Sequence, residues 1–369
     1  MAQVLLTVSG VVAPDTAELA AQGKRPRADY IEMARAFDAD LIDYAEARQR
    51  SGWLGALLER IGGPALRLAW VCFQRRGRYQ VIFTDGEQVG MPLAGLLKLA
   101  GVGAQRRPRH LMIAHILSVG KKQLFFDLLR IQSHIDMFLV YSTWQKRFIE
   151  TRWKVPAERV IFTPFMVDAR FFAPDQATPN PQPRPMICSA GLESRDYPTL
   201  LQAVSGLDIQ VTIAAASPWA RQADSTRNAA IPENVTVQRF SQFELRQLYA
   251  DSSFVVMPLY DVNYQAGVTA ILEAMAMGRA VICTRTPGQT DVVVEGETGL
   301  YVPPGDAPAL RQAIEYLINN PQEAARMGQA GRRRIEESMS LDHYTTRLNR
   351  IVQAARPTDA GKAEPYAQR

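Results

Sequence analysis

Short, mostly apolar runs recur along the chain, and helical patterns separate them. Such runs are typical of parallel strands buried on both faces, because a half-exposed strand would alternate apolar and polar residues. The first half contains such runs at residues 3–8, 41–44, 80–84, 111–115, 138–141 and 159–163. The second half contains them at residues 186–190, 210–215, 235–238, 254–257 and 280–284. The sequence therefore predicts an α/β protein with doubly wound, Rossmann-like parallel sheets.

A chain of 369 residues exceeds what one hydrophobic core usually supports, so we expect two domains. Residues 174–185 contain five prolines and few apolar side chains, which is typical of a linker. Two Rossmann-like domains would face each other across a cleft at the carboxyl ends of their strands. The predicted parts are an N-terminal domain (1–173), a linker (174–185), a C-terminal domain (186–340), a helix packing back on the first domain (341–355) and a flexible tail (356–369).

Composition narrows the classes of protein that fit. No apolar run reaches the eighteen or so residues of a membrane span, and the first residues lack a basic start typical of a signal peptide. The three cysteines show no disulfide or zinc spacing. We therefore expect a cytoplasmic protein. Residues 1–170 carry 24 Lys and Arg against 16 Asp and Glu. This excess suggests peripheral contact with anionic membrane, at residues 66–78, or a merely solvated surface.

Residues 254–305 carry the most informative pattern: a strand, a polar loop, a helix that opens at Gly267, and a second strand. A glycine at a helix start lets an anion approach the free N–H groups of Gly267, Val268 and Thr269, and the helix dipole adds attraction for phosphate. Glu273 lies about 9 Å further along the helix, at 1.5 Å per residue. We expect it to accept hydrogen bonds from a ribose, and Gln265 to face the sugar end of the ligand.

This segment resembles the retaining glycosyltransferases of family 4, which have the GT-B fold. The family motif Glu-x7-Glu runs into "LEAMA-G-PVI" and here reads QAGVTAILEAMAMGRAVI at residues 265–282. The resemblance implies that Glu273 binds the donor ribose, and that Gln265 replaces the first Glu, which contacts the donor sugar. Residues 288–306 match a later family region, and we expect Gly296, Gly299 and Gly305 in tight turns.

Two further stretches match the family's donor side. Residues 189–203 correspond to the segment that holds the diphosphate: Gly191 matches, but Leu192 stands where the family has a basic residue. Arg195 is therefore the candidate phosphate clamp, the alternative being an exposed Arg paired with Asp196. Residues 237–253 resemble the strand, loop and helix beside the nucleotide base. Phe240 and Ser241 are the candidates there, with Phe240 as plain core the alternative.

The first half contributes two candidates through the resemblance. Gly10 follows the opening strand, as in family members where this loop approaches the donor and acceptor. His115 ends a strand where the family often has a histidine near the reacting sugar; the alternative is a structural histidine. Asp168 is interpreted as structural. The four histidines have no metal-like spacing, and no metal or other cofactor is expected.

The resemblance implies metal-independent transfer of a sugar, with retention, from a nucleotide-diphosphate-sugar to an unidentified acceptor: a lipid, a glycan or a small molecule. UDP is the commoner donor nucleotide in the family, although GDP also occurs. The alternatives are an inactive nucleotide-sugar-binding scaffold and a UDP-sugar epimerase of the same architecture. No nucleic-acid partner is expected. The site residues nearest the reaction are His115, Arg195 and Gln265. The donor-binding residues are Gly10, Gly191, Arg195, Phe240, Ser241, Gln265, Ala266, Gly267, Val268, Thr269 and Glu273.

Overall fold

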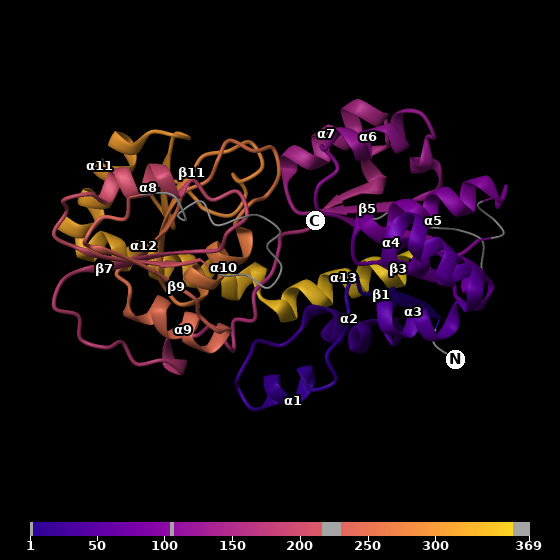
Figure 1. Ribbon diagram of the computed structural model, residues 1–369, viewed down its shortest axis with the longest axis horizontal. Coiled ribbons are helices and arrows are strands. Elements are labelled where there is room, and N and C mark those ends of the chain that lie inside the picture. Colours follow the sequence, from indigo (N-terminus) through magenta and orange to yellow (C-terminus); the bar gives the residue numbers. More distant parts are fainter. Residues whose placement is uncertain (1–2, 104–106, 216–229, 357–369) are drawn as a thin grey trace. The chain divides into compact units, whose positions relative to one another are not determined.

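The computed structural model describes residues 3–103, 107–215 and 230–356, which form two compact units (Figure 1). The first unit comprises the chain up to Glu18, Arg27–Thr163 and the part from Thr345 onward. The second comprises Leu19–Pro26 and Pro164–Tyr344. Each unit contains one six-stranded sheet whose strands are all parallel, so the predicted α/β class is confirmed.

The first sheet has the strand order β2-β1-β3-β4-β5-β6, and Val4 of β1 lies between Ala39 of β2 and Val81 of β3. All four residues of β1 and of β3 are buried, as expected for central strands covered on both faces. The strands are β1 (Val4–Thr7), β2 (Ala39–Ile42), β3 (Val81–Thr84), β4 (Arg109–Ala114), β5 (Met137–Val140) and β6 (Val160–Phe162). The helices before β6 are α1 (Thr16–Ala21), α2 (Asp29–Phe37), α3 (Tyr44–Arg50), α4 (Gly52–Arg75), α5 (Glu87–Leu99), α6 (Gly120–Asp127) and α7 (Thr143–Trp153).

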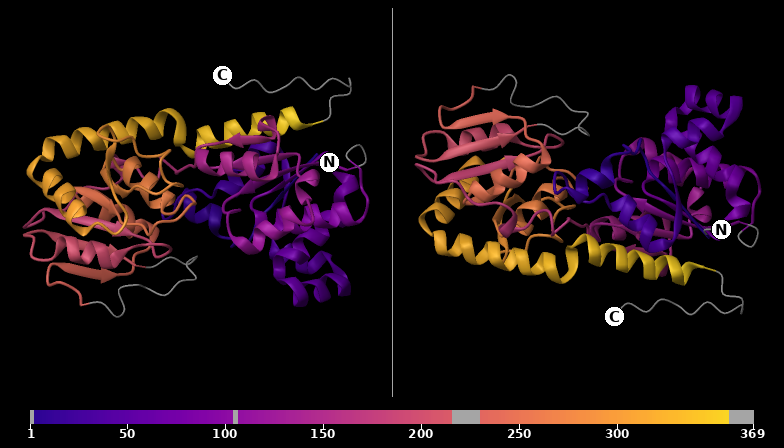
Figure 2. Two further views of the ribbon diagram at one scale, coloured as in Figure 1. Left: turned by 90° about the horizontal axis from the view of Figure 1, so that it is seen from above. Right: turned by 90° about the horizontal axis from the view of Figure 1, so that it is seen from below.

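The second sheet has the order β12-β11-β10-β7-β8-β9, which places β10 and β7 at its centre. Helices cover both of its faces (Figure 2). The strands are β7 (Met186–Ala190), β8 (Gln210–Ala214), β9 (Val235–Gln238), β10 (Phe254–Met257), β11 (Ala280–Thr284) and β12 (Gly299–Val302). The helices are α8 (Tyr197–Val204), α9 (Gln242–Asp251), α10 (Val268–Ala276), α11 (Ala307–Asn319) and α12 (Pro321–Arg334), followed by α13 (Leu341–Ala355).

Short polar side chains fix the starts of several helices. The Asp196 carboxylate accepts the Thr199 N–H at 3.2 Å to cap α8, and Asp306 accepts the Ala309 N–H at 2.9 Å to cap α11. Ser241 and Glu244 form a reciprocal capping box at α9. Each of these caps lies in the loop that follows a strand, at the carboxyl edge of the sheet. The candidate site residues lie at the same edge.

Glycines determine two local features, and the first of them differs from the sequence prediction. Gly299 begins β12 instead of forming a tight turn, because a Cβ there would lie 2.1 Å from the Val281 oxygen of the neighbouring strand. Only a glycine allows that approach. Helix α4 is interrupted at Gly63, whose φ of 78° is non-helical, and Pro64 opens the second half. Gly296 and Gly305 have positive φ in turns, as expected.

The chain passes from the first unit to the second at Thr163–Pro164, before the proline-rich residues 174–185. The reason is that Phe171 and Phe172 already belong to the hydrophobic core of the second unit. The backbone N–H of Asn180, inside the proline-rich segment, donates to Asp251 of α9 at 2.7 Å. Residues 174–185 therefore pack on the second unit instead of joining the two.

Helix α13 belongs to the second unit up to Tyr344 and to the first from Thr345. Within the first unit, the Arg347 Nε donates to Thr163 Oγ1 at 2.8 Å, and Arg356 donates to the Phe37 carbonyl at 3.1 Å. These bonds fasten the end of the described chain to the first unit. The predicted tail beyond Arg356 lies outside the described residues.

The contact between α12 and the turn before β11 yields a stability prediction. A Cβ at Gly328 would lie 2.0 Å from the Gly278 carbonyl oxygen, so the helix and this backbone could not keep their positions. We expect Gly328→Ala to lower the free energy of unfolding by about 1–3 kcal/mol, the usual cost of overpacking. Gly95→Ala, in α5 where a Cβ meets nothing within 4 Å, is the control and should leave stability unchanged or slightly higher. Equal melting temperatures of the two variants in scanning calorimetry would contradict this packing.

Candidate functional site

Most of the predicted donor residues lie at one edge of the second sheet. The loops that follow β7, β10 and β11 leave three neighbouring strands at their carboxyl ends, so these loops meet at the same edge. They contain Gly191 and Arg195, then Gln265 and Gly267, and finally residues 285–291. Open parallel sheets bind ligands at this edge.

Arg195 lies in the middle of this group. Its side chain is buried, with Nε donating to the Ala190 carbonyl at 2.9 Å and Nη1 to the Glu193 carbonyl at 2.7 Å. A Cβ placed on Gly191 would lie 2.4 Å from its Nη2 atom, and one on Gly267 would lie 3.3 Å from its Cζ atom. The guanidinium therefore packs against both glycines. Burial lowers the pKa of Arg195 below its ordinary value.

The alternative interpretation of Arg195, an exposed side chain paired with Asp196, does not fit the structure. The Asp196 carboxylate is occupied at the start of α8, where it accepts the Thr199 N–H and, at 2.7 Å, the Thr199 hydroxyl. Arg195 is also buried instead of exposed, at 6% of its full accessibility. The reason is an antiparallel bridge between Arg195 and Leu259, which draws the loop after β7 onto the loop after β10.

Gly267 immediately precedes α10 in a left-handed conformation, with φ of 75°. A side chain at this position would also crowd the Met257 sulfur, 2.9 Å from an added Cβ. Both the backbone and the space therefore require glycine. The helix starts at Val268, so its first N–H groups, which have no partner within the helix, open beside the Arg195 guanidinium. Ala266 and Val268 are buried, whereas the Thr269 side chain is exposed.

Glu273 lies further along α10 and is almost fully buried, at 6% exposure. The Tyr249 hydroxyl of α9 donates to its Oε2 atom at 2.9 Å. Burial raises the pKa of Glu273 to about 7, although the hydrogen bond from Tyr249 opposes this shift. The carboxyl is thus poised to change charge near neutral pH. Its predicted contact with a ribose stays a prediction.

The loop that carries Gln265 is fastened by contacts that the sequence analysis missed. Gln289, which is fully buried, donates from Nε2 to the Ala266 carbonyl at 2.9 Å, and the hydroxyls of Ser194 and Tyr264 form a hydrogen bond. Gly288 lies directly against the Tyr264 backbone, since an added Cβ would be 2.3 Å from its carbonyl carbon. In the sequence, Gly288 was the one residue that could have indicated these contacts.

Two buried amide oxygens in this region have no hydrogen-bond partner among the described residues. They are Oε1 of Gln265 and Oε1 of Gln289. A buried polar atom left without a partner costs free energy, so it is a natural acceptor for a ligand donor. Neither oxygen carries the charge that a carboxylate would bring.

Phe240 and Ser241 lie at the entrance to α9. The Phe240 ring is partly buried against the hydrophobic core that includes α10. The Ser241 hydroxyl donates to Glu244 at 2.7 Å and also caps the helix. Both residues therefore have structural roles, and their predicted contact with a nucleotide base stays a prediction.

The remaining two candidates, Gly10 and His115, belong to the first unit. The Gly10 carbonyl accepts the Tyr44 N–H at 2.9 Å, and a Cβ there would meet nothing within 4 Å. His115 is exposed at the carboxyl end of β4, with Nε2 3.0 Å from the Asp85 carbonyl oxygen. Its ring lies 5.4 Å from that of Tyr141.

Two carboxylates, the partly buried Asp85 and the buried Glu87, flank His115 and were missed from the sequence. Asp85 accepts hydrogen bonds from the Thr7 hydroxyl at 3.0 Å and from the Ser9 hydroxyl at 2.8 Å, while burial raises its pKa. Glu87 accepts the His115 N–H at 2.9 Å and pairs with Lys122 at 2.7 Å. Burial raises the pKa of Glu87, but His115 and Lys122 together bring it below its ordinary value.

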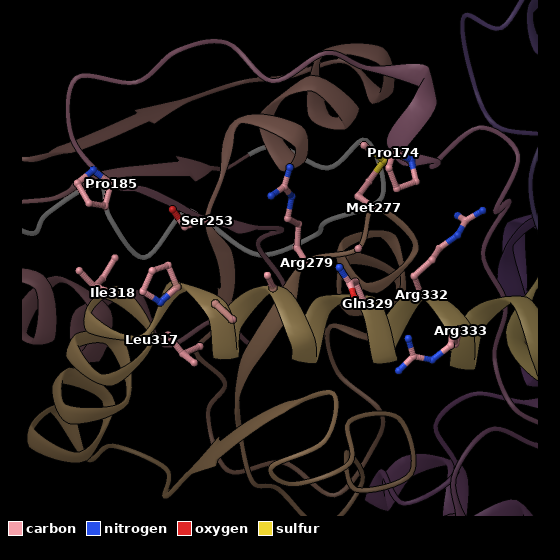
Figure 3. A pocket seen from close by; sticks show the side chains of 14 residues that line it. Pro174, Pro185, Ser253, Met277, Arg279, Leu317, Ile318, Gln329, Arg332 and Arg333 are labelled. Atoms are coloured by element: carbon pink, nitrogen blue, oxygen red, sulfur yellow. The ribbon is translucent and has the colours of Figure 1, made fainter.

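A separate cavity of about 860 Å³ opens at the opposite edge of the second sheet, near the amino ends of its strands (Figure 3). Arg279 and Gln329 line it together with Leu317, Ile318 and the prolines Pro174 and Pro185. None of the predicted site residues lines it. This cavity is therefore separate from the edge where Arg195 and Gly267 meet.

The described part of the chain shows no group of three or more His, Cys, Asp or Glu side chains arranged to hold a metal ion. Cys72, Cys188 and Cys283 are buried free thiols. In the residues that the structure covers, no helix combines the length and the apolar character needed to cross a bilayer.

The raised pKa of Glu273 predicts a pH-dependent stability. The folded protein keeps this carboxyl protonated between the ordinary pKa of 4.5 and about 7, where the unfolded chain would release the proton. Stability should therefore fall as the pH rises through this window, by at most about 1.4 kcal/mol per pH unit. Glu273→Gln should remove this part of the slope, and Glu337→Gln, on exposed surface, should not. A difference in the free energy of unfolding between wild type and Glu273→Gln that stays constant at all pH values would refute the raised pKa of Glu273.

Known proteins resemble this chain in sequence and in fold. Residues 192–320 match the family model of the glycosyl transferases group 1. An MMP alpha-(1->4)-mannosyltransferase of Mycolicibacterium hassiacum is 26% identical over 313 residues, which are 79% of this chain and 74% of that protein. A capsular polysaccharide biosynthesis glycosyltransferase of Staphylococcus aureus, CapM, is 42% identical over 69 residues, which are 19% of this chain and only 18% of CapM.

Solved structures share the whole architecture. A sucrose-phosphate synthase of Thermosynechococcus elongatus superposes with a TM-score of 0.69 at 17% identity, covering 95% of this chain and 98% of that one. Anabaena HepE, solved in complex with UDP-glucose, gives a TM-score of 0.67 at 13% identity over 95% of this chain and 99% of its own. At such identities the likeness shows the fold alone. The chain therefore has the GT-B fold, and residues 192–320 within its second unit match the glycosyl transferases group 1.

Proposed function

We propose that this protein transfers a sugar, with retention of anomeric configuration, from a nucleotide-diphosphate-sugar to an acceptor hydroxyl. One observation carries the proposal: the Arg195 guanidinium packs against Gly191 and against Gly267 at the start of α10. A fixed cation and the N–H groups of a helix start both favour a diphosphate, and here they converge on one point. UDP is proposed as the nucleotide in preference to GDP, since HepE was solved with UDP-glucose.

In the proposed reaction, the bond from the anomeric carbon to the diphosphate breaks, and its electrons leave with the nucleoside diphosphate. Arg195 and the α10 start stabilise the negative charge that develops there. The acceptor hydroxyl attacks the oxocarbenium-like carbon from the face that the diphosphate leaves, and its proton passes to the departing phosphate oxygen. These residues supply the needed charge, so no metal ion is proposed to take part.

Gln265 is proposed to contact the donor sugar. Its buried Oε1 atom has no partner among the described residues, and the loop is held in place by Gln289. A glutamine both donates and accepts hydrogen bonds, whereas a carboxylate only accepts. Gln265, which stands where the family motif has a glutamate, therefore alters which sugar hydroxyls are recognised. An inactive nucleotide-sugar-binding scaffold is the second candidate, because an amide stabilises developing positive charge less well than a carboxylate does.

The donor clamp is tested through Arg195. Arg195→Ala should weaken the binding of UDP about tenfold or more, equivalent to about 1.4 kcal/mol per decade, and leave the binding of uridine nearly unchanged. The physical reason is that only UDP carries the diphosphate. Arg326→Ala is the matched control, since Arg326 lies in the same unit on the exposed side of α12, paired with Glu323. Calorimetric affinities for UDP and uridine that fall together would show that the guanidinium does not bind the diphosphate.

The role of Gln265 is tested by nucleotide release from a panel of UDP- and GDP-sugars, with and without added EDTA. We expect the wild type to be active without a metal ion, Gln265→Ala to lose about tenfold or more in turnover, and Gln265→Glu to change the preferred donor sugar. An identical donor profile and rate for all three proteins would exclude Gln265 from the site. Binding of donors without turnover in any protein would favour the inactive scaffold.

A further inference from the structure

An apolar face is exposed on the first half of α4, in the first unit. Trp53 is 79% exposed and Ile61 is 72% exposed, and Leu57 between them is exposed as well. A spacing of four residues places all three side chains on one side of the helix. Figure 2 shows this purple segment projecting from the rest of the first unit.

The opposite side of the same half-helix is anchored to the chain that returns from it. Gly55 is buried against Ser51, and the Arg67 Nε donates to the Ser51 hydroxyl at 2.5 Å. The Arg67 guanidinium also pairs with Glu59 at 2.6 Å. These contacts fix which side faces outward, so the exposed apolar face is a property of the folded unit.

The sequence analysis placed membrane contact at residues 66–78, and the structure argues against that choice. The apolar residues Leu68, Val71 and Cys72 of this segment are fully buried in the core of the first unit. The break at Gly63 separates the two roles: the half after it packs inward, and the half before it carries the outward apolar face.

The segment that contains the exposed face has more basic than acidic residues. Residues 44–78 contain seven arginines and two glutamates, an excess of five positive charges. Both glutamates are already engaged, Glu46 by Arg50 and Glu59 by Arg48 and Arg67. Arg60, three residues beyond Leu57 on the same side, is exposed and has no ion-pair partner among the described residues.

We infer that this face docks on an anionic phospholipid bilayer. The tryptophan and the two aliphatic side chains would enter the boundary between headgroups and acyl chains, and the arginines would remain with the lipid phosphates. A second copy of the chain fits less well, because a symmetric contact would place the same basic surface against itself. Docking does not depend on the proposed transfer reaction, since none of these residues lies among the donor candidates.

The test is sedimentation of the full chain with vesicles of phosphatidylglycerol and phosphatidylcholine, compared with vesicles of phosphatidylcholine alone. We expect binding to the anionic vesicles that weakens with added salt. The double variant Trp53→Ser, Ile61→Ser should bind at least about tenfold more weakly, and Arg60→Gln should weaken binding by a smaller factor. Leu99→Ser is the matched control, because Leu99 is 85% exposed elsewhere in the first unit. It should bind like the wild type.

Three outcomes would overturn the inference. The wild type could fail to bind anionic vesicles even at low salt. The double variant could bind as well as the wild type, which would place the lipid contact elsewhere. Analytical ultracentrifugation without lipid could reveal a dimer that the double variant abolishes, which would assign the face to self-association. All the substituted side chains are exposed, so the variants should fold, and unchanged melting temperatures would check this.

Discussion

The packing of the Arg195 side chain against Gly191 and Gly267 is the interaction on which the donor edge depends. It needs a left-handed backbone at both glycines, and it needs Arg195 to be drawn inward by its bridge to Leu259. Hydrogen bonds to two carbonyl oxygens orient the guanidinium. A positive charge held at a helix start in this way is suited to a diphosphate.

The rest of the edge is organised around that point. Gln289 and Gly288 fasten the loop that carries Gln265, and Glu273 lies deeper, hydrogen-bonded by Tyr249. Fixing the loop in advance reduces the entropy that ligand binding would otherwise cost. Under the proposed function, Arg195 and the start of α10 would hold the diphosphate, and the uncharged amide of Gln265 would leave the identity of the sugar to a few side-chain contacts.

The fold could be predicted largely from the sequence, because buried parallel strands are mostly apolar. The strand at 299–302 was missed because it begins with a glycine. That glycine is needed because the backbone of Val281 in the neighbouring strand lies too close for a side chain. The linker was predicted at residues 174–185, whereas the boundary between the units lies at Thr163–Pro164. Proline-rich segments can pack on one unit as well as join two. At the candidate site, motif spacing predicted that a helix opens at Gly267, which the structure confirms; the predicted ribose contact of Glu273 stays a prediction. The burial of Arg195 and the hydrogen bond from Gln289 to the Ala266 carbonyl arise from contacts between separate loops. No local sequence pattern indicates such contacts.

Amide NMR spectra of the protein labelled with ¹⁵N at glycine would test the central claim most directly. Titration with UDP should shift the Gly191 and Gly267 signals, because a diphosphate held by Arg195 and the start of α10 would lie beside both N–H groups. The signals of Gly206 and Gly305, which have similar backbone conformations in the same unit, should remain in place. UDP binding that moves Gly206 or Gly305 and leaves Gly191 and Gly267 unchanged would contradict the account.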